Sequence, residues 1–157
     1  MAMELTEIIV RQHIEVDLLS RNKEELFSEL VNVLVRSGAV EDEKRILDAL
    51  WHREQVMNTV VAPHIALPHA SVWLFKQTVG VLGISREGID YGAPDGSRVH
   101  VAMLLVDDRY EADKHLHILK RAARLFGSPN FLKRMLASQT PEAVFEIIQQ
   151  VEEMQRP

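Results

Sequence analysis

Residues 99–106, VHVAMLLV, constrain the fold more than any other segment, because the run is almost continuously apolar. A strand with one face in water alternates apolar and polar residues, whereas a strand covered on both faces is apolar nearly throughout. Val99–Val106 is therefore predicted to be a central, buried strand. Such a strand needs packed layers on both of its faces.

Helices are predicted on both sides of this strand in the sequence. Asn22 followed by Glu25 resembles a capping pair at a helix start, and Gly38 is well placed to end that helix. The chain is thus expected to form a single domain over residues 1–157, an α/β fold with a mixed sheet flanked by helices on both sides. The expected strands are 14–18, 78–84 and 99–106, and the expected helices are 22–38, 41–53, 112–126, 130–137 and one that starts at Thr140.

The helix expected over residues 112–126 has apolar residues at helical spacing, which indicates one apolar face. The residues of that predicted face are Leu116, Leu119, Ala123 and Phe126.

Composition and charge exclude several classes of function. A net charge of -5 argues against general binding to nucleic acid or to anionic membranes, which favour basic surfaces. The absence of cysteine excludes disulfides, thiolate zinc sites and cysteine nucleophiles. Charges at Glu4, Glu7 and Arg11 are incompatible with a signal peptide, and no apolar run approaches the roughly 20 residues that span a bilayer. A cytoplasmic protein is expected.

His69 is the leading candidate for a reactive residue. It follows the run Ile65–Leu67 and Pro68, and because proline cannot donate a ladder hydrogen bond, the strand is expected to end there. His69 would then lie just past the strand end, with only the small Ala70 beside it. The alternative is that His69 merely caps a strand.

Metal and hydrolase chemistry fit the histidines poorly. His115 and His117 would point about 200° apart on a helix, and His64 and His69 would point to opposite faces of an extended segment. A zinc site would therefore take at most one histidine from each pair. No Gly-x-Ser-x-Gly elbow accompanies Ser71, and no phosphate-binding glycine loop is present. The remaining hypothesis is that a histidine itself receives a phosphoryl group.

Three motifs extend this interpretation along the chain. The first joins Glu54 to Ile65–Ala70, which reads apolar-Ala-apolar-Pro-His-small. The second is His115–Leu119, and the third is the turn-rich loop Asp90–Gly96. Together they resemble the type-2 IIA domains of the bacterial phosphoenolpyruvate-dependent sugar phosphotransferase system, the fructose/mannitol family with its nitrogen-regulatory branch. The resemblance extends over nearly the whole chain.

The resemblance implies a phosphotransferase without a metal or nucleotide cofactor. His69 would accept phosphoryl from the histidine phosphocarrier protein and pass it to a IIB partner. His115 matches the family's second active-site histidine, a hydrogen-bond partner, and Arg53 would stabilise the phosphate oxygens. Thr59 and His64 are further candidates for phosphate binding.

One segment departs from the family pattern. The family usually carries a Gly-x-Gly-x-Gly turn before the histidine run, and here those positions are Val60, Ala62 and His64, with Pro63 between the last two. Val60 does not easily adopt positive φ and Pro63 has no N–H, so either the loop is rebuilt or the phosphate site is altered.

Two rival functions therefore stand beside the sugar carrier. One is a regulatory, nitrogen-type module that controls protein partners according to its phosphorylation state. The other is a degenerate binding domain that no longer takes phosphate.

Overall fold

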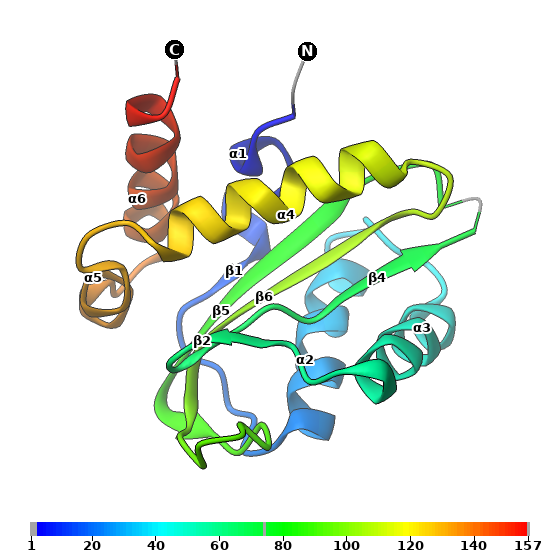
Figure 1. The fold of residues 1–157 in the computed structure, drawn as a ribbon, viewed down its shortest axis with the longest axis horizontal. Coiled ribbons are helices and arrows are strands. Elements are labelled where there is room, and N and C mark those ends of the chain that lie inside the picture. Colours follow the sequence, from blue (N-terminus) through cyan, green and yellow to red (C-terminus); the bar gives the residue numbers. More distant parts are fainter. Residues whose placement is uncertain (1–2, 74, 157) are drawn as a thin grey trace.

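The computed structural model describes residues 3–73 and 75–156, and a mixed β-sheet runs through its centre (Figure 1). The strand order is β1-β5-β6-β3-β2, and β4 also pairs with β6. β5 and β6 are antiparallel, whereas β3 and β4 both run parallel to β6. The strands are β1 (Ile14–Glu15), β2 (Val60–Ala62), β3 (Ile65–Ala66), β4 (His69–Val72), β5 (Val79–Ile89) and β6 (Val99–Asp108).

The prediction that residues 99–106 form a central strand is confirmed. β6 pairs with β5 on one side and with β3 and β4 on the other. Its side chains alternate between two apolar cores: Val101, Met103 and Leu105 belong to one, and the intervening residues to the other. Burial on both faces explains why the segment is apolar at nearly every position.

Helices cover both faces of the sheet, as predicted (Figure 1). Residues of α2 and α3 form one core with the sheet, and residues of α1, α4, α5 and α6 form the other. The helices are α1 (Leu5–Ile8), the 3-10 turn η1 (Arg11–His13), α2 (Lys23–Arg36), α3 (Glu43–Val56), α4 (Ala112–Phe126), α5 (Phe131–Ala137) and α6 (Pro141–Met154).

The ends of α2 follow the sequence signals. The Asn22 side chain accepts a hydrogen bond from the backbone N–H of Glu25 at 2.9 Å, which satisfies a donor of the first turn. Gly38, just beyond the last turn, has φ +81°, a conformation that costs other residues more. α3 ends at Val56, three residues later than expected, so Arg53 lies in its last turn.

His69 does not lie past the end of a strand; it opens β4. Pro68 interrupts the strand but does not terminate pairing, because its carbonyl still accepts from the backbone N–H of Leu105 at 3.0 Å. The N–H of Leu67 turns away to the carbonyl of Thr59 at 2.8 Å. The proline therefore separates β3 from β4 along the same edge of β6, and pairing resumes with His69 opposite Leu105.

The predicted apolar face of α4 is only partly correct, because Leu119 and Phe126 pack against the core but are not its most buried residues. The buried residues are Ile118, Ala122 and Leu125, whereas Leu116 is 53% exposed. Both sets have helical spacing, so periodicity alone does not choose between them. The other predicted residues of that face, Leu119, Ala123 and Phe126, line an apolar hollow of about 470 Å³ beside His69.

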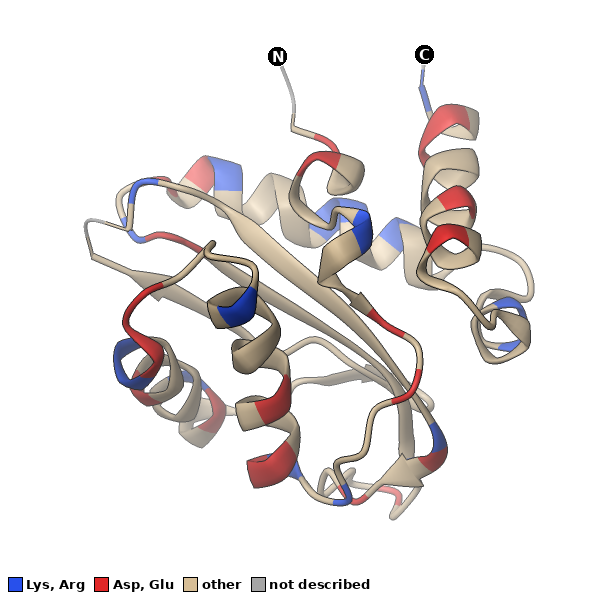
Figure 2. Cartoon of the chain, turned by 180° about the vertical axis from the view of Figure 1, so that it is seen from behind, with Lys and Arg blue, Asp and Glu red and all other residues tan. Residues whose placement is uncertain are grey.

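Charge is unevenly distributed over the elements (Figure 2). Acidic residues gather along α6, while lysines and arginines are spread over several helices and loops. Within residues 3–73 and 75–156, no helix has the length and apolar character needed to cross a membrane.

Candidate functional site

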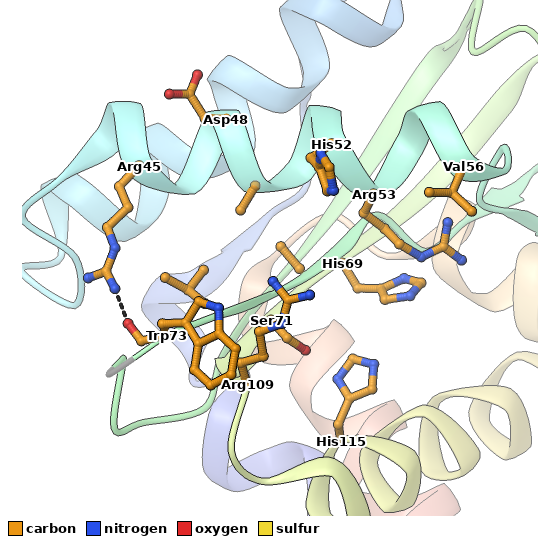
Figure 3. A pocket seen from close by; sticks show the side chains of 13 residues that line it. Arg45, Asp48, His52, Arg53, Val56, His69, Ser71, Trp73, Arg109 and His115 are labelled. Atoms are coloured by element: carbon orange, nitrogen blue, oxygen red, sulfur yellow. Dashed lines mark hydrogen bonds between the residues drawn. The ribbon is translucent and has the colours of Figure 1, made fainter.

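A cavity of about 710 Å³ lies between α3, β4 and the start of α4. Figure 3 shows the side chains of α3 on one side, His115 from α4 on the opposite side, and His69 between them. The wall is rich in cationic and imidazole groups, which suits an anion. These groups are Arg45, His52, Arg53, His69, Arg109 and His115.

His69 is held in one tautomer. Its Nδ1 lies 2.8 Å from the carbonyl oxygen of Leu67, and because a carbonyl only accepts, Nδ1 must be the protonated nitrogen. Nε2 of the neutral ring then carries the lone pair. Burial lowers the pKa of His69, and the positive charge of Arg53 adds to this effect, whereas the Leu67 hydrogen bond opposes it. The site thus presents a neutral imidazole with an available Nε2.

His115 lies beside His69, with ring centroids 5.5 Å apart. Its Nδ1 forms a short contact with Oδ2 of Asp107, a nearly fully buried carboxylate at the end of β6. The hydroxyl of Ser71 donates to Oδ1 of the same carboxylate at 2.6 Å. This is not a serine hydrolase triad, since Ser71 is bonded to the acid and not to a histidine.

Arg53 occupies a shared wall of the site. It is half-buried, and it lines both the large cavity and the apolar hollow on the other side of His69. Its Nη1 donates to the carbonyl of Met57 at 3.1 Å, which leaves further guanidinium N–H groups for an anion. His69, His115 and Arg53, predicted separately from the sequence, are thus brought together.

Thr59 is not brought to the cavity. It is buried, and its hydroxyl lies 2.8 Å from Oε2 of Glu54 and 2.6 Å from the hydroxyl of Tyr91. Lys23 forms an ion pair with the same Glu54 at 3.0 Å. Burial, more than the nearby carboxylate, raises the pKa of Tyr91, so this phenol stays protonated. The network anchors the segment that follows α3.

His64 is also turned away from the cavity. It lies in the turn between β2 and β3, after Pro63, with φ +68°. Its Nδ1 is 2.8 Å from the carbonyl oxygen of Arg98, and its ring packs against His100 with centroids 5.6 Å apart. The glycine-poor segment forms a β-hairpin, in which His64 takes the left-handed position and Val60 lies in β2 beside a register irregularity.

The sequence analysis missed several polar residues of the site, among them Asp107, Arg45 and Arg109. Asp107 holds His115, and Arg45 and Arg109 line the cavity. A signal for two of them was present, because Asp107 and Arg109 follow directly after the apolar run of β6, where a strand end carries polar groups to a sheet edge. No cluster of three or more potential metal ligands occurs in the described part of the chain.

Comparison with known proteins decides the family. The model of the phosphoenolpyruvate-dependent sugar phosphotransferase system EIIA 2 family matches residues 7–151. The chain belongs to this family. The resemblance inferred from the sequence motifs is thereby confirmed.

Individual relatives cover two branches of the EIIA 2 family. The fructose-specific EIIABC component of Bacillus subtilis (strain 168) is 28% identical over 94% of this chain, which spans only 23% of that relative. The crystal structure of the nitrogen regulatory protein IIA-Ntr from Neisseria meningitidis superposes with a TM-score of 0.83 at 26% identity, covering 90% of this chain and 97% of the other. The complex of Escherichia coli enzyme IIA-Mtl with phosphorylated enzyme IIB-Mtl has the same fold, with a TM-score of 0.73 at 20% identity, 88% of this chain and 95% of that chain.

Proposed function

We propose that this EIIA domain is a phosphocarrier whose phosphoryl acceptor is Nε2 of His69. The observation that carries the proposal is the hydrogen bond from Nδ1 of His69 to the Leu67 carbonyl, which leaves Nε2 as the nucleophilic nitrogen. Nε2 attacks the phosphorus of a phosphohistidine on the donor protein. A new N–P bond forms on His69 as the donor's N–P bond breaks, and the electron pair of the broken bond stays on the donor imidazole.

Arg53 and His115 supply the hydrogen-bond donors that such a transfer needs. Phosphoryl transfer passes through a loose transition state, so the protein mainly positions the group and stabilises its negative oxygens. Arg53 can bind two of these oxygens through its guanidinium plane. His115, with Nδ1 bonded to Asp107, donates from Nε2 when its ring carries both protons.

The proposed donor is the histidine phosphocarrier protein, and the proposed acceptor is a IIB component. Family membership supports the donor class, and the solved complex of a IIA-Mtl with phosphorylated IIB-Mtl supports the acceptor class. Transfer onward reverses the same chemistry, with the phosphoryl group leaving Nε2 of His69 for the next protein.

A regulatory role is the second candidate. The likeness to the Neisseria nitrogen regulatory protein, with a TM-score of 0.83 at 26% identity, supports it. In that role the phosphoryl group on His69 is the signal, and a partner distinguishes the two phosphorylation states.

Labelling tests the proposal. The protein is incubated with phosphoenolpyruvate, the general enzyme of the phosphotransferase system and the histidine phosphocarrier protein. A single phosphate that is labile to acid and stable to base is expected, and His69→Ala should abolish it. A labelled His69→Ala variant would show that another residue is the acceptor. An unlabelled but folded wild-type protein would favour the degenerate binding domain.

A further inference from the structure

Asp107 is a buried charge next to the reactive site that the proposed transfer does not use directly. Its side chain is 3% exposed, and each carboxylate oxygen takes a different partner: Ser71 on Oδ1 and His115 on Oδ2. The strand register produces this arrangement, because Ser71 of β4 pairs directly with Asp107 of β6. Two side chains that are opposite each other on parallel strands lie on the same face of the sheet.

Stability alone does not account for such a group. Burying a carboxylate costs several kcal/mol of desolvation, and a buried ion pair is often no more stable than apolar residues of similar volume. The two positions before it on β6, Leu105 and Val106, are apolar and almost fully buried, so an apolar side chain would suit this location. The carboxylate is instead directed at His115, whose ring is beside that of His69.

We propose that Asp107, braced by Ser71, is the positioning residue that fixes the tautomer and orientation of His115. With Nδ1–H held by Asp107, Nε2 is the nitrogen of His115 left to meet the phosphoryl group on His69. This inference rests on the proposed phosphocarrier function.

Three variants separate the parts of this arrangement. Asp107→Ala removes both the acceptor and the charge, Asp107→Asn keeps an acceptor oxygen but removes the charge, and Ser71→Ala removes only the brace. The neighbouring Asp108→Asn is the matched control. It also replaces an aspartate, but the Asp108 carboxylate accepts hydrogen bonds from the backbone N–H groups of Lys76 and Tyr110, whereas His115 is bonded to Asp107.

Phosphoryl transfer to these variants is the first readout. Asp107→Ala should slow transfer roughly 10- to 100-fold, the loss seen when a carboxylate that orients a metal-ligating histidine is removed, with Asp107→Asn and Ser71→Ala intermediate. Asp108→Asn should match the wild type. If Asp107→Ala does not fold, Asp107→Asn decides: a slower rate supports the inference, and a wild-type rate overturns it.

The second readout needs no phosphoryl donor. Nitrogen-15 NMR of the histidine rings in the unphosphorylated protein should show the Nδ1–H tautomer of His115 in the wild type, and a loss of that preference in Asp107→Ala. An unchanged His115 spectrum in that folded variant would overturn the inference. If wild-type protein accepts no phosphoryl group, the proposed function fails, while these spectra still decide whether Asp107 sets the state of His115.

Discussion

His69 combines neutrality with an available reactive nitrogen. Burial disfavours the charged ring, and the nearby Arg53 acts in the same direction. The Leu67 carbonyl holds the remaining proton on Nδ1. An exposed histidine would be partly protonated near neutral pH and would share its proton between both nitrogens.

The titration of His69 is the first prediction. Because its pKa is lowered, its NMR titration midpoint should lie below the ordinary imidazole value of 6.5. Since Arg53 contributes to this lowering, Arg53→Gln should move the midpoint upward. A midpoint at or above 6.5 in the wild type would contradict the description of His69 as a buried neutral base.

Thr59 supports the site from within the core. Thr59→Val removes the hydroxyl that meets both Glu54 and Tyr91, and leaves buried polar groups without that partner. The free energy of unfolding should fall by about 1–3 kcal/mol, measured by urea denaturation. The control is Thr78→Val, at a half-buried position outside this network. If both variants lost the same free energy of unfolding, the hydrogen-bond network of Thr59 would not contribute specifically to stability.

The helices and strands were largely predictable, because their signals are local. The Asn22 cap and the apolar run of β6 each specify one element within a few residues of chain. The break at Pro68 was misjudged, because pairing on its far side depends on β6, more than 30 residues later. The orientation of α4 likewise depends on which of its two apolar stripes packs against the sheet.

Close packing of β5 against α1 gives an element-level prediction. A Cβ added at Gly80 would lie 2.9 Å from Cγ1 of Ile9, 3.1 Å from Cδ2 of Leu105 and 3.2 Å from the backbone oxygen of Leu104. Gly80→Ala should therefore destabilise the fold by about 1–3 kcal/mol. Thermal unfolding measures this change. An unchanged melting temperature would show that the residues packed against Gly80 can move apart without a loss of stability.

The β2–β3 hairpin gives a prediction about function. Since the His64 ring packs against His100, and not in the cavity, His64→Gly should change the rate of phosphoryl transfer by less than about twofold. Arg53→Ala is the comparison and should slow transfer strongly. If His64→Gly strongly slowed phosphoryl transfer while its melting temperature matched that of the wild type, His64 would have to be assigned to the phosphate site.

The site exists only where separate parts of the molecule meet. His69 comes from β4, Arg53 from α3 and His115 from α4. The family motifs identified these residues singly. The sequence could not show that Ser71 and Asp107, 36 positions apart, share a hydrogen bond, because that contact depends on the register between β4 and β6.

Buried histidines should make the stability of the whole molecule depend on pH. The pKa values of His13 and His69 are lowered in the folded protein, mainly by burial, so the unfolded chain binds protons first as the pH falls below 6.5. Stability should therefore decrease from about pH 7.5 to about pH 5.5. Urea midpoints measure the decrease, and His13→Gln should reduce it. If stability stayed constant or increased as the pH was lowered through this range, burial of the neutral histidine rings would be contradicted.

The most direct test is to locate the phosphoryl group on the protein. Phosphorylated protein labelled with nitrogen-15 at histidine should show coupling between phosphorus and Nε2 of His69, while Nδ1 keeps its proton. That result is expected because the Leu67 carbonyl reserves Nδ1. Phosphorus on Nδ1 of His69, or on His115, would contradict the account.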